Sequence, residues 1–103
     1  MESMAMKIEL ILEHYGLEAQ TIKAIEELAE LQAELAKMLN KQSGHDALIS
    51  EIADVYIMLT QLMVIFDIDV EEIDLEMSRK IDRQIRRIEE GDNGQDVYGR
   101  GND

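Results

Sequence analysis

Cysteine and proline are both absent from this chain of 103 residues, and aromatic side chains make up only 4% of it. Without cysteine there is neither a disulfide framework nor a thiolate metal site. The lack of proline and the many Ala, Leu, Ile, Met, Glu and Lys residues are typical of a helical protein. The first seven residues do not have the pattern of a secretory signal. We therefore expect a cytoplasmic, all-α protein.

Basic residues are also scarce, because 10 Lys and Arg stand against 23 Asp and Glu and give a formal net charge of −13. Binding to nucleic acid or to an anionic membrane requires a basic surface, so this charge argues against both partners. The most apolar run, residues 55–66, is too short to cross a bilayer and contains Thr60 and Gln61. We expect this run to lie in a core or an interface, with no membrane and no nucleic acid as a partner.

The first half of the chain is expected to form two helices. Apolar spacing predicts a helix over residues 4–15, and Gly16 follows where helices commonly stop. A longer helix is predicted over about residues 18–41. Its packing seam alternates spacings of four and three and consists of Ala24, Leu28, Leu31, Leu35 and Met38.

Two more helices are expected in the second half. Ser43 is predicted to cap the third helix, with Asp46 as its capping-box partner, and this helix should end near Phe66. Asp69 and Glu72 are predicted to form a capping box at the start of a fourth helix. The apolar positions of that helix are Val70, Ile73, Met77, Ile81, Ile85 and Ile88.

The expected architecture is one all-α, four-helix domain over residues 1–90, followed by a mobile polar tail over residues 91–103. The third helix carries apolar residues around almost its whole circumference, so we expect it to be buried nearly all round. One chain of this length has too few other helices to cover it. We therefore expect a homo-oligomer, a dimer or tetramer, in which helices of two or more chains combine into a bundle.

Two acidic pairs at helical spacing are the strongest indication of a functional site. Glu27 and Glu30 lie on the second predicted helix, and Glu51 and Asp54 lie on the third. Residues three apart project from the same side of a helix, so the two pairs are able to face each other. Four carboxylates directed at one place repel each other unless a cation lies between them. Mg²⁺ is a hard cation that prefers carboxylate oxygens, so the pattern favours a magnesium site, with Mn²⁺ as a substitute.

The simpler interpretation is an ordinary solvated acidic face. The first pair shares an arc of its helix with Lys23 and Lys37, as an exposed surface would. The second pair lies on a helix expected to be buried, where carboxylates without partners are costly or become protonated. A lysine of the second helix would compensate one of these charges, whereas a metal ion accounts for all four acids together. The sequence therefore favours the site.

These acidic motifs resemble the signature of a known family. Glu-Glu-Leu-Ala-Glu at residues 26–30 and Glu-Ile-Ala-Asp at residues 51–54 are similar to those of the all-α nucleoside triphosphate pyrophosphohydrolases of the MazG-like superfamily. The resemblance covers roughly residues 16–87. It implies a Mg²⁺-dependent enzyme that cleaves a (d)NTP between the α and β phosphates and releases a (d)NMP and pyrophosphate.

The resemblance also assigns roles to residues. It implies that the four acids of the two pairs are the metal ligands and the catalytic residues, with Glu26 as a neighbouring support. Ser50 departs from the family pattern, because many relatives carry a further acid at this position. This departure leaves open whether one or two metal ions bind.

A basic segment follows the acidic motifs, since five of the ten Lys and Arg lie between Arg79 and Arg87. We expect Lys80 and Arg83 to bind the phosphates of the substrate, because ammonium and guanidinium groups suit phosphate oxygens. The alternative is that these residues form ordinary helical ion pairs, such as the pair of Glu76 with Lys80.

Other functions remain open at this point. Phosphoribosyl-ATP pyrophosphohydrolase resembles the same superfamily in fold and acidic motif. A helical interaction or regulatory protein with an acidic face and no chemistry is the alternative from another class. A carboxylate di-iron bundle fits less well, because the usual Glu-x-x-His pairs are missing.

Overall fold

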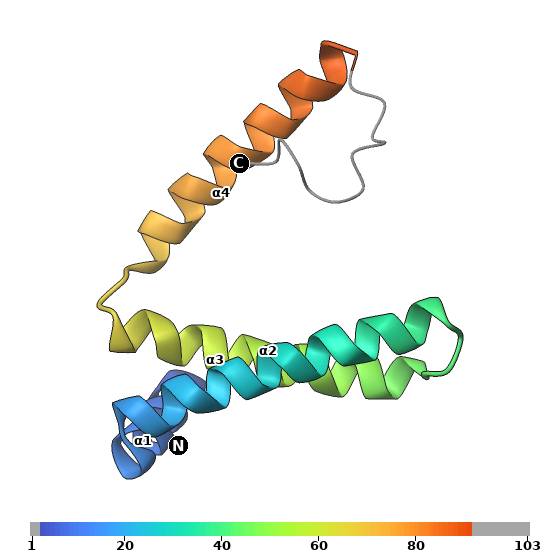
Figure 1. The fold of residues 1–103 in the computed structure, drawn as a ribbon. Helices are drawn as coiled ribbons and strands as arrows, with labels where there is room; N and C mark the ends of the chain where they lie inside the picture. Colours follow the sequence, from blue (N-terminus) through green and yellow to red (C-terminus); the bar gives the residue numbers. More distant parts are fainter. Residues whose placement is uncertain (1–2, 92–103) are drawn as a thin grey trace. The chain divides into compact units, whose positions relative to one another are not determined.

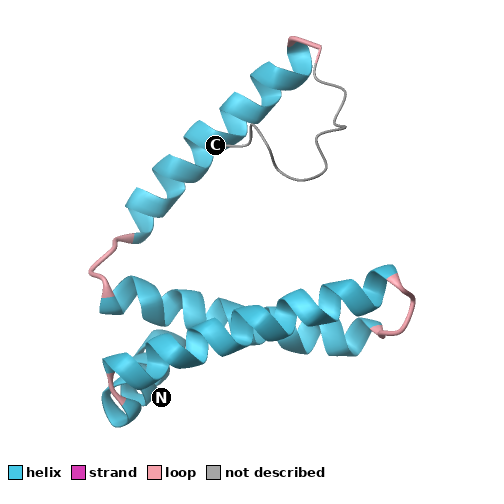
Figure 2. Cartoon of the chain, viewed as in Figure 1, coloured by secondary structure: helices cyan, strands magenta, loops and turns pink. Residues whose placement is uncertain are grey.

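A computed structural model of the chain describes residues 3–91. Over this range the only regular secondary structure is helical and there is no strand, which confirms the expected all-α class and its four helices (Figures 1 and 2). The helices are α1 (Met4–Tyr15), α2 (Leu17–Leu39), α3 (His45–Ile65) and α4 (Val70–Glu89). The chain divides into two compact units, Met1–Asp67 and Ile68–Asp103. The tail predicted over residues 91–103 lies, apart from Gly91, outside the described residues, and the boundary after residue 90 stays a prediction.

Gly16 ends the first helix and begins the second. Its φ of 93° is a conformation that side chains with a Cβ rarely adopt. Its N–H donates to the carbonyl of Leu12 at 2.8 Å, and its own carbonyl accepts from Gln20 at 3.1 Å. The predicted helix break at this residue is therefore confirmed. It lets α1 fold back against both α2 and α3.

The turn between α2 and α3 differs from the prediction at its second half. The Gln42 N–H donates to the carbonyl of Lys37 at 2.8 Å, and Lys41 adopts a left-handed φ of 58°, as in a Schellman motif. Because this turn uses the chain up to residue 42, the extended cap conformation comes later, at Gly44. The predicted capping box was therefore wrong, since the Ser43 hydroxyl instead donates to the Gly44 carbonyl at 3.4 Å.

The core of the first unit is small and lies mainly between α2 and α3, which run side by side as an antiparallel hairpin (Figure 1). Its buried apolar residues are Ile8, Leu12, Ala24, Val55 and Met58. In α3 only Val55, Met58 and Gln61 are buried, whereas Tyr56 is 69% exposed. The expectation that α3 is buried nearly all round is not met within this chain, because α1 and α2 cover only one of its sides. Assembly with further copies stays a prediction.

The length and hydropathy of α3 are relevant to whether the chain contacts a membrane. This helix is 21 residues long and has a window of mean hydropathy 1.7, so by length and composition it is able to span a membrane. The core helix of a soluble protein meets the same two criteria, so this observation is weak. The predicted absence of a membrane partner and the cytoplasmic location stay predictions.

The described part of the second unit contains α4, whose start follows the prediction. The Asp69 N–H donates to the Glu72 carboxylate at 2.8 Å, which is one half of the capping box that the sequence predicts. Arg79 forms an ion pair with Glu76 at 2.6 Å one turn later, and this bond lowers the pKa of the Glu76 carboxyl below its ordinary value. None of the residues of α4 is buried.

Candidate metal centre and its pocket

Three of the four predicted acidic ligands converge between α2 and α3. Glu27 comes from α2, and Glu51 and Asp54 come from α3, one turn apart. Each offers one carboxylate oxygen, and the three oxygens lie within 4.8 Å of one another. Ligand oxygens around a single Mg²⁺ lie about 3 to 4 Å apart, because each is about 2.1 Å from the ion. We call these three residues the acid cluster. Small side-chain adjustments would fit them to one cation.

Two oxygens of the acid cluster lack a hydrogen-bond partner among the described residues. Glu27 is only 6% exposed, and its Oε2 is buried and unpaired. The Oε2 atom of Glu51 is in the same condition. Buried polar atoms in folded proteins nearly always have a partner, since leaving one unsatisfied costs free energy. A cation between the helices would supply the missing partner to both oxygens.

The charges within the cluster are unfavourable by themselves. Burial raises the pKa of the Glu51 carboxyl above its ordinary value, and the negative charges of Glu30, Asp54 and Glu27 raise it further. Both causes disfavour the ionised form of this side chain. A divalent ion would reverse the balance, because it favours carboxylates in their ionised state.

Glu30, the fourth predicted ligand, is exposed and is not a member of the acid cluster. Its negative charge nevertheless raises the pKa of the Glu51 carboxyl more than any other neighbouring charge does. It therefore belongs to the electrostatic surroundings of the cluster, and its role as a ligand stays a prediction. Glu26, the expected support, is exposed and lines the adjoining pocket.

Lys23 is the cation that the structure places beside the cluster. Its Nζ atom lies 3.4 Å from Oε1 of Glu27, and its side chain is 53% exposed. The hydrogen bond with Glu27 raises the pKa of the lysine. The sequence contains the signal for this pair, because the residues are four apart on one helix, but that spacing is also typical of ordinary surface pairs. One ammonium compensates only part of the charge of three carboxylates.

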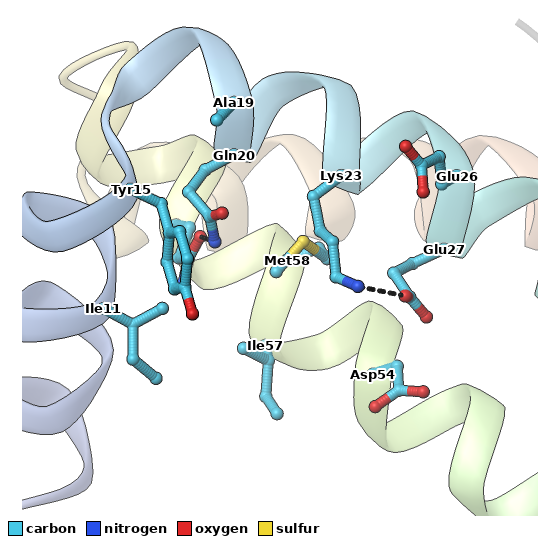
Figure 3. A pocket seen from close by; sticks show the side chains of 11 residues that line it. Ile11, Tyr15, Ala19, Gln20, Lys23, Glu26, Glu27, Asp54, Ile57 and Met58 are labelled. Atoms are coloured by element: carbon cyan, nitrogen blue, oxygen red, sulfur yellow. Dashed lines mark hydrogen bonds and ion pairs between the residues drawn. The ribbon is translucent and has the colours of Figure 1, made fainter.

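A pocket of about 600 Å³ adjoins the acid cluster (Figure 3). It has an acidic end formed by Glu26, Glu27 and Asp54, and an apolar end to which α1 contributes Ile11 and Tyr15. The remaining lining residues are Ala19, Gln20, Lys23, Ile57, Met58 and Gln61. The site thus combines carboxylates that are able to hold a metal with a neighbouring surface for an organic group.

Two buried glutamines that line this pocket were not predicted as site residues from the sequence. Nε2 of Gln20 donates to Oε1 of Gln61 at 2.7 Å, and the two side chains are 6% and 1% exposed. Their spacing from the acids on the two antiparallel helices is the sequence feature that indicates them. Gln20 precedes Glu27 by seven residues, and Gln61 follows Asp54 by seven, so both amides lie two helical turns from the acids.

Lys80 and Arg83, the predicted phosphate-binding residues, are half-buried positions on α4. They belong to the second unit, whereas the acid cluster and its pocket belong to the first. Their contact with a substrate stays a prediction.

Comparisons of the chain with protein-family models, with curated proteins and with solved structures found no match. The resemblance to the MazG-like superfamily therefore rests on the acidic motifs alone. The geometry of the acid cluster is an independent observation that bears on the same chemistry.

Proposed function

We propose that this chain is a Mg²⁺-dependent nucleotide pyrophosphohydrolase. It would cleave a (d)NTP between the α and β phosphates and release a (d)NMP and pyrophosphate. The observation that carries the proposal is the convergence of three carboxylates from two helices beside a pocket, with two buried oxygens that have no hydrogen-bond partner in the described part of the chain. A cluster of this kind suits a hard divalent ion, and such ions commonly accompany phosphate substrates.

In this proposal the residues have different roles, which follow from their positions. Glu27, Glu51 and Asp54 would hold the ion, with Glu30 beside them. The bound ion would polarise phosphate oxygens and make a water molecule a better nucleophile. Lys23 is exposed enough to exchange its bond with Glu27 for a phosphate oxygen once the acids are neutralised. Lys80 and Arg83 would stabilise the charge that develops on the departing pyrophosphate.

We also propose that the active species is a homo-oligomer, a dimer or tetramer. The open side of α3 supports this, since Ile49, Tyr56 and Leu59 are all more than two fifths exposed in the single chain. A second copy would cover such a surface. Sedimentation velocity at micromolar concentration tests this proposal, and a helical, soluble monomer would contradict it.

One observation favours an interaction protein as a second candidate. The apolar residues of α4 are exposed, with Met77 at 52% and Ile81 at 54%, which suits the binding of a partner helix. A chain that captures a protein partner and hydrolyses no nucleotide would support this function over the enzyme.

The test is a panel of nucleoside triphosphates and phosphoribosyl-ATP, incubated with the full chain and Mg²⁺ or Mn²⁺. The expected products from a triphosphate are the monophosphate and pyrophosphate, resolved by ion-exchange chromatography. In ¹⁸O-labelled water the label should enter one of these two products and not free orthophosphate. Faster hydrolysis of phosphoribosyl-ATP than of any triphosphate would favour the alternative function, phosphoribosyl-ATP pyrophosphohydrolase. A nucleoside diphosphate and orthophosphate as primary products would mean attack at the γ phosphate, which contradicts the proposal.

A further inference from the structure

We propose that Lys23 competes with the divalent ion for Glu27, and that the ion releases the lysine to bind an anionic group of the substrate. This inference rests on the acid cluster of the proposed function, but it does not depend on hydrolysis. It adds a form of regulation to that site, because one side chain makes binding of the ion and binding of the anion depend on each other.

Glu27 is the ligand for which the lysine and the ion compete. Its Oε1 lies 3.4 Å from Nζ of Lys23, and its Oε2 is buried without a hydrogen-bond partner among the described residues. Glu27 is 6% exposed, whereas the side chain of Lys23 is 53% exposed. Packing therefore holds the carboxylate in place between the helices. The lysine is the partner that is able to move.

The ammonium of Lys23 is a close neighbour of any ion at the acid cluster. Its hydrogen bond with Glu27 raises the pKa of Lys23, and the negative charges of Glu27, Glu26 and Glu30 raise it further, so the side chain is charged at neutral pH. A divalent ion coordinated by Glu27 lies about 2.1 Å from its ligand oxygen. The ion and the ammonium repel each other there, and the ion has twice the charge. The exposed lysine is therefore displaced.

The pocket gives the displaced ammonium a second position. Lys23 lines the wall between the acidic end at Glu27 and the apolar end at Tyr15 (Figure 3). A phosphate group held by the ion at the acid cluster would lie next to this part of the wall. An ammonium has three donors and suits phosphate oxygens. Lys23 thus exchanges a carboxylate for a phosphate, and this exchange couples the two ligands.

The first measurement is the binding of Mn²⁺ alone to the full chain, followed by the EPR signal of the free ion. Lys23→Met removes the positive charge, so it should bind Mn²⁺ roughly tenfold more tightly than the unaltered chain. Lys23→Arg keeps the charge and should bind Mn²⁺ as the unaltered chain does. Lys37→Met is the matched control, since it removes an equal charge from an exposed position ten residues beyond Glu27 on α2. Solvent and salt screen that charge, so the affinity should change less than about twofold.

The second measurement is the binding of inorganic phosphate, followed by NMR chemical shifts of the backbone amides. The unaltered chain should bind phosphate more tightly in saturating Mg²⁺ than in EDTA, because the ion releases the lysine. In Mg²⁺, Lys23→Met should bind phosphate roughly tenfold more weakly, since a charge-assisted hydrogen bond is lost. A general loss of structure would weaken the binding of both ligands, whereas these two changes have opposite signs. Lys23→Gln should show both changes, and it keeps the test decisive if Lys23→Met does not fold.

Three results would overturn the inference: no binding of Mn²⁺ or phosphate by the unaltered chain, an affinity for Mn²⁺ in Lys23→Met no higher than in Lys37→Met, or phosphate binding that Lys23→Met leaves unchanged. Both expected changes in a chain that hydrolyses no nucleotide would overturn the proposed function and leave the inference standing. Hydrolysis of triphosphates by a chain whose Mn²⁺ affinity is the same with and without Lys23 would have the opposite meaning.

Discussion

The two units of this chain are stabilised in different ways. Every buried residue among those described lies in α1, α2 or α3, and none lies in α4. The first unit depends on contacts between residues distant in sequence, such as the bond between Gln20 and Gln61. At the start and in the middle of α4, the capping box and the ion pair of Glu76 with Arg79 each join residues three apart in sequence. The acid cluster combines carboxylates from two helices, α2 and α3, and it lies in the first unit.

The core of the first unit also has an unusual composition. It contains five buried apolar residues and three buried polar ones, Gln20, Glu27 and Gln61. Two of these three carry a buried atom that lacks a hydrogen bond among the described residues. Polar groups in this condition destabilise a fold unless a ligand satisfies them. The first unit should therefore gain more from ligands than a core of ordinary composition would.

The largest expected effect comes from removing a member of the acid cluster. Glu51→Gln or Asp54→Asn should lower turnover by roughly a hundredfold or more, since even partners of metal ligands are worth 10- to 100-fold. In the unaltered chain, Mg²⁺ at one hundred times its dissociation constant should raise the free energy of unfolding by about 2.7 kcal/mol. Both variants should lose this response, measured by thermal unfolding with and without the ion.

A matched control uses an acid away from the cluster. Glu9→Gln changes an exposed carboxylate on α1 and should leave both turnover and the Mg²⁺ response unchanged. If the unaltered chain is equally stable with and without Mg²⁺ or Mn²⁺, the metal site is refuted.

Local features of the fold could be predicted from the sequence. Gly16 and the box of Asp69 with Glu72 follow from residue type and short spacing, and both were confirmed. The cap of α3 could not be placed correctly, because its position depends on a left-handed turn at Lys41, a residue type that rarely marks such a turn.

The site was predictable only in part. The spacing of three indicates which acids share a side of a helix, but it does not say how deep each one lies. Packing buries Glu27 and leaves Glu30 exposed, although both belong to one motif. Gln20 and Gln61 were missed because a lone glutamine has no pattern of its own. Their pairing becomes visible only once the register of α2 against α3 is known.

Lys80 and Arg83 would make the second unit a participant in catalysis, and substitutions at these residues test that role. Of Lys80→Ala and Arg83→Ala, at least one should lower turnover by roughly a hundredfold, because a positioned cation stabilises the departing pyrophosphate more than the ground state. The Mg²⁺ response should remain, since the acid cluster is intact. Arg79→Ala is the control, because its exposed pair with Glu76 should contribute little. Normal turnover in both test variants would restrict the site to the first unit.

The smallest expected effect is a pH dependence that differs between the units. The pKa of Glu51 lies above its ordinary value of 4.5, so the folded state binds this proton more tightly than the unfolded state does. In the metal-free chain, the unfavourable contribution of ionised Glu51 is present above the raised pKa and is relieved as the pH falls toward 4.5. The pKa of Glu76 in α4 is lowered instead, so its favourable contribution is lost as the pH falls below 4.5.

Urea unfolding in EDTA over a pH series, with Glu51→Gln as the comparison, isolates the first of these contributions. The stability advantage of the variant over the unaltered chain should shrink as the pH is lowered toward 4.5, because protonated Glu51 resembles glutamine in charge. With saturating Mg²⁺ in place of EDTA, the unaltered chain should become more stable than Glu51→Gln, since the ion binds the ionised carboxylates. This gain should fall in the same pH range, because protons displace the ion. A difference between the two chains that stays constant from neutral pH to 4.5 would show that Glu51 is not held in an environment that opposes its charge. The carboxylates of the acid cluster would then behave as an ordinary solvated face in the metal-free chain.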